Sequence, residues 1–184
     1  SKTDAVTDTS ITIDRRFEDD RVIHKVTVVR THHGGDDELG FYNRQNPAYV
    51  RILIPEDGEL MKISGNDLTN FKPIINYANQ PDFVSDDDLT NFETTFYKDE
   101  FVGVDRFEES GKEGIGFWMV TEPGTTKKVE FEYSVSLQGA SLYKDAPCNC
   151  YSFYFQKQPG LDWKNFTFKF HKPEDMDITE TVPA

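Results

Sequence analysis

The sequence predicts an all-β protein built as an antiparallel β-sandwich, immunoglobulin-like or similar, with a long irregular connection. The strongest observation is the segment of residues 128–137, in which apolar and polar side chains alternate. Successive side chains of a strand point to opposite faces, so this segment is expected to be a strand with one dry and one wet side. Such one-sided strands are typical of antiparallel sheets. The apolar members are Val129, Phe131, Tyr133, Val135 and Leu137.

Composition and turn residues favour the same class. The chain holds fifteen Phe and eight Tyr against three Met, and aromatic side chains fit the pleated surface of a sheet. Proline–glycine turns separate short segments that show no long helical period. We therefore expect about eight or nine short strands. The length fits a single domain over residues 1–184.

In the N-terminal half, residues 10–14 and 21–31 are expected to be two strands joined by an exposed acidic turn at residues 18–20. Residues 49–54 and 59–64 are expected to pair as a hairpin around Pro55-Glu56-Asp57-Gly58. Residues 66–93 show no sustained period of either kind. We interpret them as a long connection or insertion, with room for a helical turn.

In the C-terminal half, the clearest hairpin pairs residues 117–120 with residues 127–137 around a Pro-Gly turn. Residues 151–156 and 166–170 are expected to close the fold, and the acidic residues 173–184 to form a frayed tail. Alternation within the last strand predicts that three aromatic side chains share one core with Phe131: Phe166, Phe168 and Phe170.

The charge of the chain narrows the possible partners. A net charge of −13 argues against nucleic acid, because its binding depends on Lys and Arg that neutralise phosphates. No apolar run approaches the ~20 residues that span a bilayer, so we expect no membrane insertion by this segment. We expect a soluble monomer.

The chain opens on Ser1 without an initiator Met, so we expect it to be part of a longer protein, with any membrane anchor outside it.

Two acidic or histidine-rich stretches resemble metal sites only weakly. His32 and His33 precede Asp36 and Asp37, but adjacent residues of a strand point opposite ways, so a loop is the favoured interpretation. The run Asp86, Asp87, Asp88 lacks the alternating spacing of a calcium loop and is expected to be solvated charge. We therefore expect no metal and no cofactor.

Aromatic and thiol side chains leave alternatives open. Trp118 and Trp163 each lie near a Pro-Gly turn; sandwiches bury tryptophan routinely, so core packing is favoured over an aromatic platform for sugar. Together with His32 and His33, they are the candidate ligand-binding residues. Cys148 and Cys150 could be structural or free thiols, could form a local disulfide, or could bind a metal or form an intermolecular bond. No Gly-x-Ser-x-Gly elbow is present, so we expect no enzyme.

Several short motifs occur in the order seen in a known family. They are Lys2-Thr3-Asp4-Ala5, Thr31-His32-His33-Gly34-Gly35, Asn43-Arg44 with Tyr49-Val50-Arg51, Pro55 with Gly58-Glu59-Leu60, Pro123-Gly124 with Glu132-Tyr133, and Gln156-Lys157-Gln158-Pro159-Gly160. The chain resembles the C-terminal part of the bacterial family named domain of unknown function 4012. The segment of residues 82–109 and Cys148-Asn149-Cys150 depart from it. The resemblance implies an envelope-associated protein whose membrane helix and central domain precede these residues, and it implies no catalytic residues.

These observations predict a non-catalytic, extracytoplasmic sandwich that acts in interaction or structural support at the cell surface, with a protein or glycan partner. The alternatives are a carbohydrate- or peptide-binding module, or an accessory domain to envelope-polymer enzymes. An exposed tryptophan beside a groove would favour ligand binding, whereas two buried tryptophans would favour support.

Overall fold

The computed structural model describes residues 2–68, 80, 82–136, 153, 155–156 and 163–174. The described part of the chain is mostly β-strand, with one short α-helix and two 3-10 helices. The elements are η1 (Lys2–Val6), β1 (Thr7–Glu18), β2 (Arg21–His32), η2 (Gly40–Asn43), β3 (Asn46–Pro55), β4 (Glu59–Ser64), α1 (Asp87–Glu93), β5 (Tyr97–Asp99), β6 (Val104–Glu109), β7 (Lys112–Thr121), β8 (Thr126–Ser136) and β9 (Trp163–Phe170).

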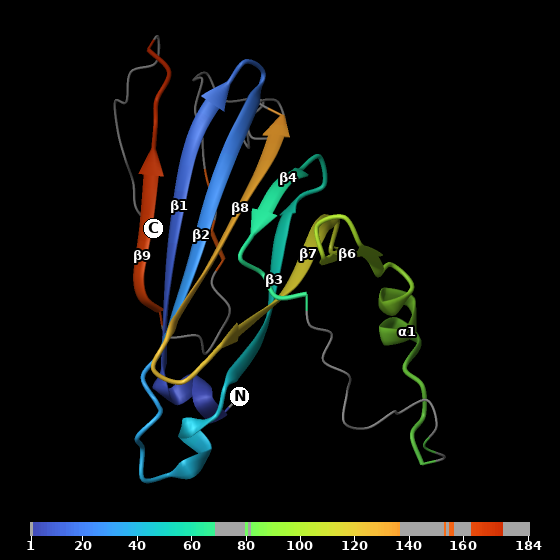
Figure 1. The fold of residues 1–184 in the computed structure, drawn as a ribbon. Helices are drawn as coiled ribbons and strands as arrows, with labels where there is room; N and C mark the ends of the chain where they lie inside the picture. Colours follow the sequence, from blue (N-terminus) through green and yellow to red (C-terminus); the bar gives the residue numbers. More distant parts are fainter. Residues whose placement is uncertain are drawn as a thin grey trace.

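The strands form two sheets (Figure 1). Sheet A has the order β4-β8-β2-β1-β9, and sheet B has the order β3-β7-β6-β5. The predicted hairpin of residues 117–120 and 127–137 is wrong, because β7 and β8 do not pair with each other. β7 pairs with β3 and β6 in sheet B, and β8 pairs with β2 and β4 in sheet A. The turn between them carries the chain from one sheet to the other. Every strand pairing is antiparallel except that of β1 with β9, which is parallel. The prediction of an all-β sandwich is confirmed.

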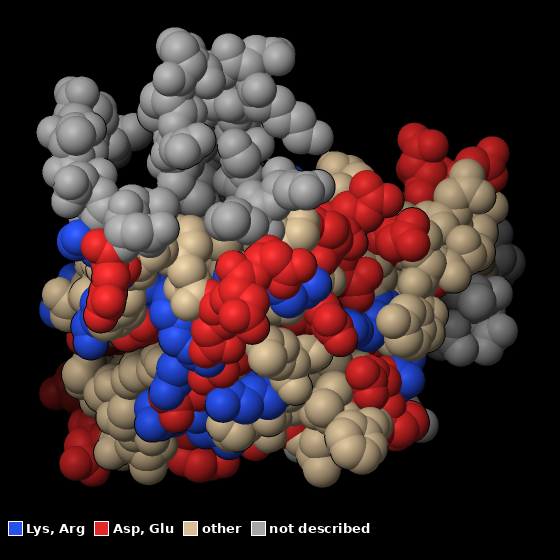
Figure 2. Space-filling view, turned by 90° about the horizontal axis from the view of Figure 1, so that it is seen from above, with Lys and Arg blue, Asp and Glu red and all other residues tan. Residues whose placement is uncertain are grey.

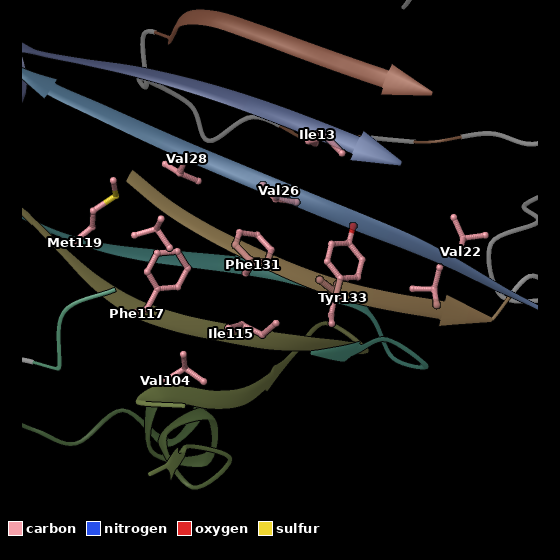
Figure 3. Packing of buried hydrophobic residues seen from close by; sticks show 13 residues of the cluster. Ile13, Val22, Val26, Val28, Val104, Ile115, Phe117, Met119, Phe131 and Tyr133 are labelled. Carbon is pink, nitrogen blue, oxygen red and sulfur yellow. The ribbon is translucent and has the colours of Figure 1, made fainter. Parts of the chain in front are cut away.

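The core lies between the inward faces of the two sheets (Figure 3). Sheet A contributes alternating residues of β8, including Phe131, which is 1% exposed. Sheet B contributes alternating residues of β7, including Phe117, whose ring centre lies 6.1 Å from that of Phe131. The alternating apolar residues of β8 thus share the inward face of sheet A, and four of them are buried as predicted: Val129, Phe131, Tyr133 and Val135.

The predicted burial of the β9 phenylalanines is wrong. Phe166 and Phe168 are 43% and 39% exposed, and neither belongs to the core cluster. Their register partners on β1, Ile11 and Ile13, show that they do point to the inward face. However, β9 is the edge strand of sheet A, and sheet B packs over β8 and β2 instead (Figure 1). Phe166 and Phe168 contact Phe155 and Phe153, respectively.

Several strands are longer than the sequence predicted. β1 runs from Thr7 to Glu18 because its polar residues, too, pair with β2 along its whole length. β7 begins at Lys112, five residues before the expected start at residue 117. The prediction missed these residues because Gly114 and Gly116 have no side chains that would reveal the alternation of a strand. The two predicted turns at residues 18–20 and 55–58 lie where expected. The predicted hairpin of residues 49–54 and 59–64 is wrong, because the chain changes sheet at the second turn: β3 pairs with β7 in sheet B, and β4 pairs with β8 in sheet A. The connection at residues 66–93 ends in helix α1.

Some predictions lie outside the described residues. These include Cys148, Cys150, most of the strand expected at residues 151–156, the end of the tail, and the side chain of Trp163.

Candidate functional site

The outward face of sheet B carries a tyrosine that lies flat along the sheet. A Cβ on Gly116 would lie 2.6 Å from Tyr49 Cζ, so the Tyr49 ring occupies the space above this glycine. The ring crosses from β3 over β7, and its hydroxyl donates to Asp105 Oδ2 on β6 over 2.7 Å. Burial, and then this hydrogen bond, raises the pKa of Tyr49 well above its ordinary value. The hydroxyl therefore stays protonated and holds the ring in place.

Trp118 lies beside Tyr49 and not in the core, so the favoured prediction for this tryptophan is wrong. It alternates with the buried Phe117 and Met119 of β7 and therefore points outward. It is directly opposite Tyr49 in the β3–β7 register, with ring centres 5.0 Å apart and ring planes at 53°. Both rings are partly exposed. Sequence reasoning failed here because Trp118 neighbours apolar residues on both sides.

A second glycine of β7 lets another aromatic cluster form on the same face. A Cβ on Gly114 would lie 2.2 Å from a ring carbon of Phe107, so the Phe107 ring covers Gly114. Phe96 stacks on Phe107 at 4.6 Å, and Phe92 of α1 meets Phe107 edge-on at 5.8 Å. These two ring contacts attach α1, through Phe92, and the following segment, through Phe96, to sheet B.

We define the acidic lobe as residues 82–101, the part of the chain around α1 (Figure 1). It contains seven acidic residues and one lysine. It also exposes five large apolar side chains, of which Val84 and Phe101 are 95% and 97% exposed. The other three are Phe83, Leu89 and Tyr97. In Figure 2, red acidic side chains lie beside tan ones on the side where α1 projects. The lobe is thus both strongly acidic and apolar at its surface.

The aspartates of the lobe have a structural explanation. Asp86 is the N-cap of α1, and its side chain accepts a hydrogen bond from Leu89 N over 3.0 Å. Asp87 and Asp88 occupy the first turn, where the helix dipole favours negative charge. Among the residues that the structure describes, no group of three His, Cys, Asp or Glu side chains could hold a metal ion.

His32 is a buried structural residue, which corrects its assignment to a ligand-binding loop. It ends β2 and is 1% exposed. Gly34 N–H donates to His32 Nδ1 over 3.0 Å, so the proton resides on Nε2, which lies 2.9 Å from Arg44 O and donates to it. Both ring nitrogens are thereby used to fix the loop that follows β2.

The candidates next to His32 in the sequence form hydrogen bonds with other surface residues or within the loop that follows β2. His33 Nε2 lies 2.8 Å from Asp8 Oδ2, and this hydrogen bond is the main reason that the pKa of Asp8 is lowered. Asp37 Oδ1 accepts from Leu39 N over 2.7 Å, and the Asn43 side chain bonds to the backbone of Asp37. The structure therefore separates His32 from His33 and does not bring either one to Asp36 and Asp37 as a ligand set.

His24 is a buried histidine without a basic role. Its ring stacks on Tyr133 at 4.5 Å, and burial, together with the charge of Arg15, lowers its pKa to about 3. A base this weak is unprotonated and inert at neutral pH. Arg15 itself is fully buried among aromatic rings, with its guanidinium carbon 5.6 Å from the ring centres of Phe17 and Phe153. His24 is thus a buried residue of sheet A whose ring packs against Tyr133 and Phe153.

The sequence contained one signal for the outward face of sheet B that was missed. Glycines inside a strand mark places where another group approaches the backbone closely, and Gly114 and Gly116 mark the places of Phe107 and Tyr49.

No known protein family, curated protein or solved structure matches this chain. Within the described residues, the one α-helix is far too short to cross a membrane.

Proposed function

We propose that this chain is a non-catalytic interaction module, carried outside the cytoplasm by a larger, envelope-associated bacterial protein. The observation that carries the interaction role is the acidic lobe, which exposes Val84, Leu89 and Phe101 among seven carboxylates. Exposed apolar groups rimmed by charge are typical of protein–protein interfaces. The envelope placement rests on the resemblance to the domain of unknown function 4012 family.

Charge complementarity selects the partner of the lobe. Its single basic residue, Lys98, forms an ion pair with Asp105 over 3.2 Å, whereas Asp87, Asp88 and Glu93 are exposed. A matching surface therefore has apolar side chains surrounded by Lys and Arg. The partner is a protein with a basic, amphipathic segment.

A pair of designed peptides tests this function. A labelled amphipathic helix of Lys and Leu should bind the chain, and the same helix with Glu in place of Lys should not. Binding of the Lys peptide should weaken at high salt, because salt screens exposed charges. Equal binding of the two peptides would contradict the proposal.

Matched variants separate the lobe from the general negative charge. Leu89→Ser with Phe101→Ser, and Asp87→Asn with Asp88→Asn, should each weaken binding of the Lys peptide. The apolar control is Met61→Ser on β4, which is 51% exposed outside the lobe. The charge control is Asp19→Asn with Asp20→Asn in the β1–β2 turn. If the control variants bind as weakly as the lobe variants, the lobe is not the binding surface.

A further inference from the structure

The Tyr49–Trp118 face is a rigid aromatic surface with polar neighbours. The Tyr49 ring lies over Gly116, fixed at one end by β3 and at the other by its hydrogen bond to Asp105. Trp118 contacts it on the same face. A platform held in this way loses little conformational entropy when a ligand covers it.

Charged groups of both signs surround the two rings. Asp105 accepts the Tyr49 hydrogen bond with Oδ2, and its Oδ1 lies 3.2 Å from Lys98 Nζ. Arg51 lies opposite Gly116 on β3, is half exposed, and approaches Glu109 only to 3.6 Å. Carboxylate, ammonium and guanidinium groups thus lie beside an aromatic surface, with balanced charge.

We propose that this face binds a neutral saccharide. A sugar ring has an apolar C–H face that packs on aromatic rings, and hydroxyl groups at its rim that donate to carboxylates and accept from Arg or Lys. Tyr49 and Trp118 supply the ring contact, and Asp105 and Arg51 supply the polar partners. The net charge of −13 repels polyanionic glycans, so the ligand is an uncharged hexose or N-acetylhexosamine chain.

This site does not depend on the proposed protein partner. It uses residues of β3, β6 and β7, whereas the partner surface uses residues 82–101; Lys98 is the one residue in common. Variants of each surface therefore test one proposal and leave the other intact.

Tryptophan fluorescence gives a direct readout. The chain has two tryptophans, so Trp163→Phe leaves Trp118 as the sole tryptophan. This variant is titrated with maltohexaose, cellohexaose, chitohexaose and polygalacturonate, each up to about 5 mM, a range that detects millimolar binding. At least one neutral oligosaccharide should change the Trp118 emission saturably, and polygalacturonate should not.

Calorimetry with the full chain assigns the binding to the face. Trp118→Ala should weaken binding of the active oligosaccharide by about tenfold or more. Arg51→Ala, at a half-exposed position of β3, should weaken it severalfold. Phe101→Ser in the acidic lobe should leave the affinity unchanged.

The outcomes are decisive for this site. Saturable binding that both face variants weaken supports the proposal. Absence of binding by all three neutral oligosaccharides would overturn it, as would binding that Arg51→Ala and a folded Trp118→Ala leave unchanged. Tighter binding of polygalacturonate than of the neutral chains would overturn the assignment of a neutral ligand.

Discussion

One row of side chains across sheet A shows how a buried charge and a neutral histidine coexist. Arg15, His24 and Tyr133 are direct neighbours in the strand register and are all buried. Arg15 faces the rings of Phe17, Phe153 and Phe170, which attract a cation. Burial lowers the pKa of Arg15 to about 9, so its guanidinium is charged at neutral pH. This charge and burial keep His24 neutral.

His24 should make the protein less stable in acid. The pKa of His24 is lowered from 6.5 to about 3 in the folded state, so the unfolded state binds the proton more tightly. The stabilising contribution is complete above pH 6.5 and is lost as the pH falls toward 3. The slope approaches about 1.4 kcal/mol per pH unit. Urea unfolding at a series of pH values measures it.

The matched variant for this test is His24→Phe. Phenylalanine keeps the stacking on Tyr133 and removes Nδ1, which has no hydrogen-bond partner among the described residues. The free energy of unfolding of the variant should fall less between pH 6.5 and pH 4 than that of the native chain. Parallel pH profiles for the two proteins would show that His24 does not titrate in this way.

Glycine 114 should tolerate no side chain. A Cβ at this position would lie 2.2 to 2.5 Å from three ring carbons of Phe107, and that ring is fully buried. Gly114→Ala should therefore lower the free energy of unfolding by about 1–3 kcal/mol through overpacking. Gly40→Ala is the control, because no atom lies within 4 Å of its added Cβ, and it should change stability by about 0.5 kcal/mol or less. Chemical denaturation of both variants distinguishes them.

At the scale of the elements, local pattern predicted the direction of side chains better than their burial. Alternation correctly placed Phe131 and Phe168 on inward faces, because side-chain direction depends only on the local backbone. Burial depends on which strand another sheet covers, and that is a nonlocal property. β8 lies under sheet B, whereas β9 is an edge strand. The edge position of β9 has no signature in residues 163–170.

Two phenylalanine truncations measure this difference. Phe131→Ala removes a ring that is 1% exposed at the centre of the core, and it should cost about 3–5 kcal/mol of unfolding free energy. Phe168→Ala removes a ring that is 39% exposed and should cost about 1 kcal/mol. Urea denaturation midpoints, compared at equal m-values, give both numbers. Similar costs for the two variants would mean that β9 belongs to the same core.

The candidate site was only partly predictable for the same reason. Trp118 was recognised as a possible platform residue, but its partners Tyr49 and Asp105 lie 69 and 13 positions away and come together only through sheet pairing. The run Asp86–Asp88 was expected to be solvated charge, and the structure places it at the N-terminus of α1, with Asp86 as the N-cap. An aspartate N-cap followed by acidic residues is a local signal for a helix start, but the contact of Phe92 with Phe107 on β6 is nonlocal and could not be predicted from the sequence.

Over the whole molecule, negative charge exceeds positive charge by 13. Acidic and basic side chains interleave over the part of the surface seen in Figure 2. Ion pairs at the surface include Lys25–Glu130 and Arg16–Glu18. Exposed pairs of this kind contribute about 0–1 kcal/mol each. Repulsion among the surplus carboxylates opposes the compact state. At low ionic strength, we expect the repulsion among surplus carboxylates to exceed the attraction within the ion pairs.

Added salt should therefore stabilise the chain by screening alone, without a specific metal. Raising NaCl to about 0.15 M shortens the Debye length to about 8 Å and should raise the thermal midpoint by a few degrees. CaCl2 at the same ionic strength should give the same rise, because the aspartates of α1 serve as its cap and first turn. EDTA should leave the midpoint unchanged. Calorimetry in matched NaCl and CaCl2 measures the difference, and an excess of many degrees in CaCl2 would reveal a calcium site that the expected metal-free fold does not include.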